Sequence, residues 1–455
     1  MRIPIARPLF AWDCLEDSPS LQTVRDFLHA LPDAKLLKAL HQWRGHGRND
    51  VPISCLWGTF LLTILLRHLT VEACLAELAR NRSLRELIGI PSEEEVPKKW
   101  NISRFQKVLG TEPHLSLIRE MFDTMTQRLA QLVPDLGQKT AGDSTGLGAR
   151  AQRSADAAGP LEGPAGGRKE YTDQDGKVTK VLEWFGYKLH LLVDIHHEVV
   201  LSYQITPANR GDNEMIPDLV KQARTNLGED LDQPYTRMAR LAYDKAADAQ
   251  EVHEFLDGCG IRPLVQMRSL WKTDPERMLP GHDGNRNVVY DEAGTIYCYD
   301  KVSDPPVRRA MAYIGHEAAR GTLKYRCPAC HGGFQCPSFE RCNAGKSYGK
   351  TVRVKREIDL RRFPPIPRAT KTFEREYKGR TAVERVNARM KIFWGADDGN
   401  VTGAERFHAN VGVVMLVHIG LATLLAASPR REGTLGQTRL SPIAQALEPV
   451  AMWGA

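Results

Sequence analysis

The sequence predicts a mixed α/β protein, in which a sheet-containing core follows an all-α region and is interrupted by a mainly β insertion. Apolar residues recur at helical spacing up to about residue 112. Strand-like runs then alternate with helical stretches from residue 138, and short β-like pieces surround a cysteine cluster within 266–371. A chain of 455 residues is too long for one ordinary core, so we expect two or three domains.

The composition is that of a soluble globular protein. Hydrophobic residues make up 42% and charged residues 26%, which excludes a disordered, collagen-like or disulfide-dense chain. Nine cysteines, four of them crowded together, indicate a reducing compartment with one candidate metal site. The first residues carry no secretory signal. We therefore expect a cytoplasmic protein.

The first region, residues 1–112, is predicted to be helical. Leu36, Leu37, Leu40 and Trp43 recur at three- and four-residue spacing, and Pro91 and Pro97 act as breakers. Exposed Arg and Lys on such a domain would suit DNA binding. A plain interaction or dimerisation module is an equally favoured alternative.

The first part of the core, residues 113–265, is predicted to form a mixed sheet with helices on its faces. A Gly/Ala/Ser-rich stretch, 146–167, is expected to be a flexible loop. The expected strands are 139–145, 186–194, 199–205, 236–243 and 261–265, and the expected helices are 104–109, 115–132, 215–227 and 247–256.

The insertion is expected over 266–371, with strands near 287–290, 295–299 and 310–313. The core returns over 372–427 with a long helix from Glu374 to Trp394 and an apolar helix near 404–427. The longest apolar stretch, Val411–Ala427, is short of the roughly 20 residues needed to span a bilayer and is interrupted by His418, so we expect a buried core helix. Residues 428–455 are expected to be a loosely held tail.

The most informative segment is the helix that returns to the core. At about 100° per residue, Tyr377, Arg380, Glu384 and Lys391 share one polar face within roughly 60°. Arg380 and Glu384 could simply form a surface pair four residues apart. The apolar seam on the opposite side is narrow, however, and a tyrosine is less expected on a purely solvated stripe.

The spacing Tyr-x2-Arg-x3-Glu-x6-Lys resembles the signature of a large group of DDE insertion-sequence transposases. Asp143 in AGDST and Asp244 in LAYDKAAD resemble the first two acidic residues of that family, in the same chain order. The resemblance covers about residues 139–427. It is less close after the second aspartate, where Ala246 and Ala247 replace the usual Gly-Tyr.

The resemblance implies an RNase H-like core in which Asp143, Asp244 and Glu384 hold two Mg²⁺ ions, with Mn²⁺ as a substitute. Three carboxylates suit such a site, because two Mg²⁺ can activate the attacking oxygen and neutralise the leaving one. The implied activity is cleavage of double-stranded DNA at the transposon inverted-repeat ends, followed by joining of the 3′-hydroxyl to target DNA. A nuclease that never joins, or a silent DNA-binding descendant, is the alternative.

The resemblance also assigns DNA contacts. Tyr377, Arg380 and Lys391 would grip phosphates, and Trp271 of the insertion would stack on an unpaired base. Trp184 is a second aromatic candidate, with core packing as the default for both. A homodimer on DNA is expected, bound to the bacterial nucleoid. No membrane partner and no nucleotide cofactor are expected, because GDSTGLG lacks the Lys-Ser/Thr of a P-loop.

Several other groups are candidate sites. Cys327, Cys330, Cys336 and Cys342 could bind a structural zinc, with unliganded thiols at even odds. Asp248 rivals Asp244, but its place just inside the expected helix favours a role at that helix N-terminus. The spacing of the histidines matches no ligand set, so we expect structural or surface roles for His190, His196, His197 and His253.

The net charge of +7 is unevenly distributed. Residues 344–391 hold 15 Lys and Arg against 5 Asp and Glu, a net +10, so the rest of the chain sums to −3. This basic stretch leads into the segment that carries Glu384. Its position predicts that it holds phosphates beside the catalytic residues.

Overall fold

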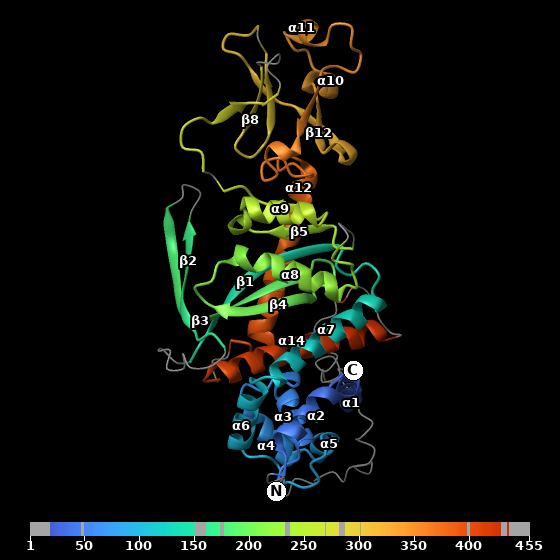
Figure 1. The fold of residues 1–455 in the computed structure, drawn as a ribbon, viewed down its shortest axis with the longest axis vertical. Coiled ribbons are helices and arrows are strands. Elements are labelled where there is room, and N and C mark those ends of the chain that lie inside the picture. The colour runs from blue at the N-terminus through green and yellow to red at the C-terminus, as the bar shows by residue number, and fades with distance from the viewer. Residues whose placement is uncertain are drawn as a thin grey trace, which may run out of the picture.

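The protein is arranged along one long axis in the computed structural model (Figure 1). The N-terminal helices lie at one end, a mixed sheet with its helices lies in the middle, and the β-rich insertion lies at the other end. The structure describes the residues 19–46, 50–150, 161–172, 177–232, 237–268, 270–281, 287–300, 302–397, 401–428 and 435.

The N-terminal region is helical, as the sequence predicts. Thr70 and Asn81 begin two of its helices, because their side-chain oxygens accept hydrogen bonds from the backbone N–H groups of Ala73 and Leu84, both at 3.1 Å. Its core is built around α3, which is buried along almost its whole length. The helices are α1 (Pro19–Ala30), α2 (Ala34–Arg44), α3 (Ile53–Leu65), α4 (Val71–Arg80), α5 (Arg82–Leu87) and α6 (Lys99–Leu109).

Two long helices connect this region to the sheet. α14 (Ala404–Ala427) is apolar and long enough to cross a membrane by composition, yet most of it is buried against α7 (His114–Leu132), α6 and β4 (Val200–Pro207). Inside this packing the ring Nε2 of His418 accepts a hydrogen bond from the backbone N–H of Val200 at 3.2 Å. Burial lowers the pKa of His418 to about 3, so the ring is neutral and can accept this bond. The expected buried core helix is therefore confirmed.

The central sheet is mixed, which confirms the predicted fold class. Its strand order is β4–β3–β1–β5–β6, and β2 extends it by pairing with the first half of β3. β1 is antiparallel to β3 and parallel to β5, and β5 is parallel to β6. This arrangement is consistent with an RNase H-like core. The remaining strand bounds are β1 (Lys139–Gly148), β2 (Ala165–Thr172), β3 (Val178–Asp194), β5 (Arg240–Tyr243) and β6 (Arg262–Val265).

The expected loop over 146–167 is partly wrong, because β1 runs on to Gly148 and β2 begins at Ala165. Trp184 of β3 explains this extension. Its indole lies over Gly146 and Gly167, where a Cβ would come within 2.6 Å and 2.5 Å of the ring. The glycines thus provide the flat surface on which Trp184 packs, rather than loop flexibility. Residues 151–160 of the expected loop lie outside the described residues.

Two helices follow the hairpin of β3 and β4. α8 (Asp212–Asn226) packs on β3 and β4 and crosses in front of the sheet in Figure 1. α9 (Gln250–Gly258) begins later than predicted, so Asp248 lies before this helix and does not cap it. The expected helix role of Asp248 is therefore wrong. Its buried carboxylate instead accepts hydrogen bonds from Arg361 and from the backbone N–H of Arg268, both at 2.7 Å.

The insertion is mainly β, as predicted, and contains two small antiparallel sheets. The first has the order β10–β9–β8–β7 and the second β11–β12–β13. They share one small core that includes Ile296, Leu323 and Val354. The strands are β7 (Glu276–Met278), β8 (Val288–Asp291), β9 (Ile296–Tyr299), β10 (Arg308–Ala310), β11 (Ala312–Glu317), β12 (Thr322–Arg326) and β13 (Thr351–Lys355), with short helices α10 (Pro328–Gly332) and α11 (Phe339–Asn343).

The segment returning to the core is helical, but it is not the single regular helix that was predicted. α12 (Lys371–Tyr377) leads through a 3₁₀ turn at Lys378–Arg380 into α13 (Thr381–Ala388). α13 then widens into a π-helical turn over Arg389–Phe393. A π turn advances by more residues than an α turn, so positions after Ala388 leave the face expected from regular spacing. In Figure 1 the orange segment that includes α13 passes behind the sheet.

Candidate active site

The parallel pairing of β1 and β5 brings Asp143 and Asp244 side by side. Ala141 lies opposite Ala242 in the register. Asp143 follows two residues later on β1, and Asp244 is the extended residue directly after β5. Side chains two residues apart point to the same side of a strand, so both carboxylates face one side of the sheet. Asp244 also begins the short 3₁₀ turn after β5, because its Oδ1 accepts the N–H of Ala246 at 2.8 Å.

α13 places Glu384 on this same side. The helix packs on β1 and β3, and Asn387, one turn after Glu384, lies with its Nδ2 3.4 Å from Oδ2 of Asp143. Arg380 completes the link, since it hydrogen-bonds Glu384 at 2.7 Å and also interacts electrostatically with Asp143. Asn387 was not predicted from the sequence. Its position three residues after Glu384 is the only signal that could have identified it.

The carboxylates interact unfavourably with one another. Burial raises the pKa of Asp143 to about 6, and the neighbouring charge of Asp244 adds to this rise. The positive charges of Lys169 and Arg380 and the backbone N–H of Ser144 oppose it. A pair of acidic groups held this close is a donor set that a divalent cation would stabilise, because the cation offsets both the burial and the repulsion.

Tyr377 and Arg380 lie next to each other beside Glu384. The Tyr377 ring stacks on Phe373 with centroids 5.5 Å apart, and the Arg380 guanidinium carbon lies 5.9 Å from the Tyr377 centroid. Burial raises the pKa of the Tyr377 hydroxyl, and the charge of Arg380 opposes this rise. Three of the four residues of the predicted stripe therefore meet, at the 3₁₀ turn and in the first turn of α13.

Lys391 takes a different position, on the π turn. Its ammonium donates to the carbonyl of Gly146 at 2.8 Å and pairs with Asp397 at 2.9 Å. Asp397 in turn accepts the backbone N–H of Gly148 at 2.7 Å. The structure thus places Lys391 at the far end of β1, where it ties the segment after α13 to this strand.

The family model described as the transposase DDE domain matches residues 138–419, which run from the start of β1 into α14. The chain belongs to this family. No curated protein matches the chain. Transposases of this family act on DNA and use divalent metal ions. In the structure Glu384 is half exposed and pairs with Arg380, and its carboxylate does not form a close group of three with those of Asp143 and Asp244.

Other predicted site residues of the transposase lie in its insertion. Trp271 packs edge-on against Tyr290, and the guanidinium carbons of Arg277 and Arg362 lie 4.1 and 5.0 Å from its ring centroid. Cys298, which sequence spacing did not point to, lines one small cavity together with Cys327, Cys336 and Cys342. Cys330 lies close to Cys327 instead.

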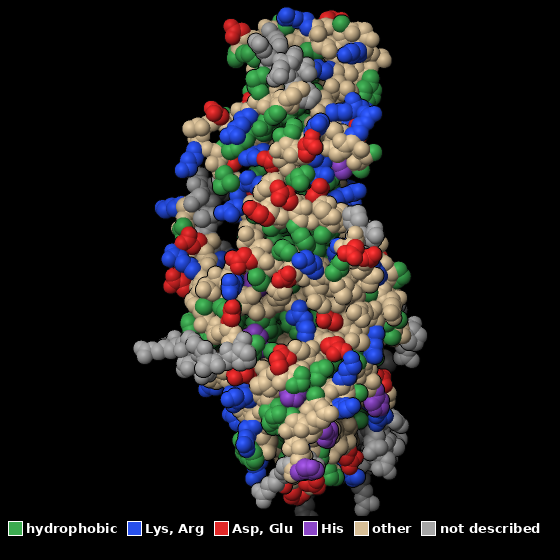
Figure 2. Space-filling model, in the orientation of Figure 1, with side chains coloured by type: hydrophobic (Ala, Val, Ile, Leu, Met, Phe, Trp, Pro, Cys, Tyr) green, Lys and Arg blue, Asp and Glu red, His purple; other side chains and the backbone are tan. Residues whose placement is uncertain are grey.

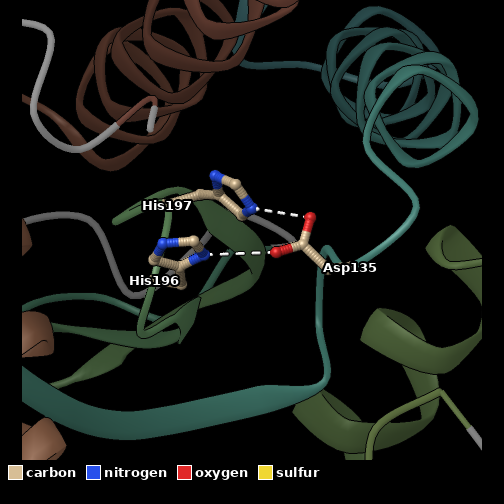
Figure 3. A group of neighbouring side chains, drawn as sticks. All are labelled: Asp135, His196 and His197. Carbon is tan, nitrogen blue, oxygen red and sulfur yellow. Dashed lines mark hydrogen bonds and ion pairs between the residues drawn. The ribbon is translucent and has the colours of Figure 1, made fainter. Parts of the chain in front are cut away.

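A histidine pair of the transposase meets an aspartate at the turn between β3 and β4 (Figure 3). Asp135 Oδ2 lies 3.2 Å from His196 Nδ1, and its Oδ1 lies 3.1 Å from His197 Nε2. The donor atoms of these three side chains all lie within 4.8 Å of one another, and no other such group of His, Cys, Asp or Glu occurs among the described residues. The distances are those of ordinary hydrogen bonds, so the cluster fastens the turn to the loop between α7 and β1.

The basic stretch at 344–391 is used differently from the prediction. Arg356 and Arg361 are buried and pair with Asp257 and Asp248 inside the protein, at 2.5 and 2.7 Å. Figure 2 shows the Lys and Arg side chains at the surface of the insertion mixed with acidic ones. Part of the net +10 therefore balances charge within the fold, and sequence counting could not reveal this because the partner aspartates lie far away in the chain.

Glu198, which the sequence did not single out, fixes the helix that carries Glu384. It occupies the β3–β4 turn in the left-handed region, with φ of 52°. Its carboxylate accepts hydrogen bonds from Arg385 at 2.6 Å and Arg389 at 2.9 Å, and its carbonyl accepts a second bond from Arg389 at 3.1 Å. The Asp135–His197 contact holds the same turn from the other side.

We expect Glu198→Gln to reduce DNA cleavage roughly tenfold to a hundredfold, because supporting contacts of metal ligands have effects of about this size. The Mg²⁺ concentration giving half-maximal cleavage should rise, since Glu384 would be less well held. Glu214→Gln is the control, as Glu214 is exposed and its closest ion pair is a 3.9 Å contact with Arg210. An unchanged Mg²⁺ requirement in Glu198→Gln would refute the role.

Proposed function

We propose that the protein cuts DNA at transposon ends and joins the freed 3′-hydroxyl to target DNA, with Asp143, Asp244 and Glu384 holding two Mg²⁺ ions, for which Mn²⁺ can substitute. The observation that carries the proposal is the parallel register of β1 and β5, with α13 packed across β1. When bound, the ions supply an activated oxygen nucleophile and neutralise charge on the leaving oxygen.

In the first step a water oxygen forms a bond to phosphorus and the P–O3′ bond breaks, leaving a 3′-hydroxyl and a 5′-phosphate. In the second step this 3′-oxygen bonds to a target phosphorus, and a P–O3′ bond of the target strand breaks. The three carboxylates would hold the ions at the same place in both steps. Arg380, 21% exposed beside Glu384, can donate hydrogen bonds to a phosphate oxygen.

The remaining assignments follow the same proposal. Tyr377 and Lys391 border the path of the DNA backbone, and Trp271 stacks on an unpaired base near the insertion. A homodimer would hold two transposon ends on the bacterial nucleoid, without a nucleotide cofactor. The working domains are 1–112 for DNA binding, 113–265 and 372–427 for the core, 266–371 for the insertion and 428–455 for the tail.

The cysteine cluster is a candidate structural zinc site in the insertion, although no three of its sulfurs lie within 4.8 Å of one another in the structure. We propose that the ligands come from Cys327, Cys330, Cys336 and Cys342, which are free thiols in the structure. Cys330 packs next to Cys327, and the other two line the cavity with Cys327. Four thiolates form a closed tetrahedral site, so the zinc would stabilise the insertion without taking part in the reaction.

Supplying a pre-cut transposon end with a free 3′-hydroxyl tests the joining step. We expect covalent joining to plasmid DNA in Mg²⁺ or Mn²⁺, and none with a 3′-dideoxy end or with Asp143→Asn. Cutting of an intact end without joining of the pre-cut end would favour a nuclease. If the wild type neither cuts nor joins DNA more than Asp143→Asn does, the protein is a silent, DNA-binding descendant.

A further inference from the structure

A cavity lies away from the acidic residues, where the N-terminal helices meet the core. Its volume is about 520 Å³, within the range of clefts that hold small ligands. One wall comes from the ends of α3 and α6, and the opposite wall comes from the π turn after α13, from the start of α14 and from Arg150. The groove is therefore shared by both regions.

The ionisable lining of this groove is mainly basic. Arg67, Lys99, Arg150 and Arg406 face one acidic residue, Glu72, which pairs with Lys99. Arg67 and Arg406 are held in place, since Arg67 donates to the carbonyl of Phe393 at 2.9 Å and Arg406 to that of Ser103 at 2.9 Å. Clefts lined by one sign of charge concentrate oppositely charged ligands.

The groove lies beside the end of β1, the strand that carries Asp143. Its wall starts at Ile392, directly after Lys391, which is bonded to Gly146. Arg150 follows the end of β1, where Asp397 binds the N–H of Gly148. Ile392 is 79% exposed at the rim, so an apolar side chain faces solvent beside the cations. A DNA strand that leaves the carboxylates along β1 would reach this groove next.

We propose that this groove binds the sugar-phosphate backbone of one DNA strand next to the cleavage site. The proposal rests on the proposed function, because the strand is part of the same DNA substrate. A cavity of about 520 Å³ has the size of clefts that hold a small ligand, so it can take up part of a single strand but not a duplex. Arg150 and Lys99 contact phosphates, and Arg67 and Arg406 maintain the walls.

The test measures binding of a fluorescein-labelled 30-nucleotide single strand by anisotropy, in EDTA so that no DNA is cut, over a range of NaCl concentrations. Arg150→Gln combined with Lys99→Gln should weaken binding about fivefold and make the log–log salt slope less negative by about 1.4, or about 0.7 for each phosphate that is no longer neutralised. Glu72→Gln should change affinity in the opposite direction, because it removes the one acidic group and releases Lys99. A variant that binds DNA more tightly than wild type cannot owe this change to misfolding.

Arg320→Gln and Glu86→Gln serve as controls, because Arg320 pairs with Glu317 in the insertion and Glu86 pairs with Arg82 in the helical region, and neither lines the groove. Unchanged affinity and salt slope in the Arg150 and Lys99 variant would overturn the proposal, as would the absence of any binding by the wild type. If the wild type binds through these residues but cuts no DNA in Mg²⁺, the groove stands and the catalytic proposal fails.

Discussion

Glu384→Gln is expected to reduce DNA cleavage and strand transfer by a factor on the order of 10³ or more, the size of effect seen when a central catalytic group is removed. The amide keeps the shape of the side chain and the helix propensity, but it lacks the negative charge that a metal ion requires. Binding of DNA in EDTA should remain within a few-fold of wild type. The measurement is single-turnover cleavage of a labelled transposon end in Mg²⁺.

Glu374→Gln provides a matched control on the preceding helix. Glu374 forms an ion pair with Lys378 four residues later, as Arg380 does with Glu384, and both pairs lie on the same returning segment. If Glu384 served only as half of a surface pair, the two substitutions would have equally small effects, since exposed pairs of this kind contribute little. Equal activities would therefore contradict the catalytic assignment.

Asp248→Asn is expected to lower the free energy of unfolding by about 3–5 kcal/mol, the cost of removing one partner from a buried ion pair. The Asp248 side chain is fully buried and lies 2.7 Å from Arg361 and 3.5 Å from Arg368, whose side chains are 9% and 7% exposed. Without the carboxylate, two guanidinium groups stay buried without their counter-charge. Urea unfolding followed by tryptophan fluorescence measures the loss.

The pH dependence of this loss follows from the pKa of Asp248. Burial raises that pKa, but hydrogen bonds from His253, Arg361 and the Arg268 N–H outweigh burial, so the pKa lies below its usual value. The carboxylate therefore stabilises the fold above the unfolded-state pKa of about 3.9, and this contribution disappears as the pH falls below it. The difference between wild type and Asp248→Asn should shrink in acid. Glu357→Gln, at an exposed pair with Lys355, should show no such difference at any pH.

Much of the fold could be predicted from the sequence because the signals are local. The hairpin of β3 and β4 and the apolar helix α14 each contain an apolar run that matches a continuous buried stretch. The spacing from Tyr377 to Glu384 also predicted a shared face, since adjacent helical turns fix which side chains meet. The family match over residues 138–419 agrees with the resemblance to DDE transposases that was inferred from this spacing.

The errors arose where distant segments determine local structure. The first residues of β2, 165–167, were expected to be loop because a Gly/Ala/Ser-rich stretch can bury little, yet the long β3 and the Trp184 indole stabilise a strand there. Asp248 was assigned to a helix terminus because its buried partners, Arg361 and Arg368, are more than a hundred residues away in the chain. Lys391 left the predicted stripe because the helix widens after Ala388.

The sequence by itself determined the mixed α/β class, the family resemblance and the order of the candidate acidic residues, because composition and spacing are properties of short segments. The tertiary structure decided which carboxylates share a face, how Glu198 holds α13, and where the basic groove lies. These depend on strand register and on contacts between residues far apart in the chain. Such contacts form only when the segments pack together, and no periodicity in the sequence encodes them.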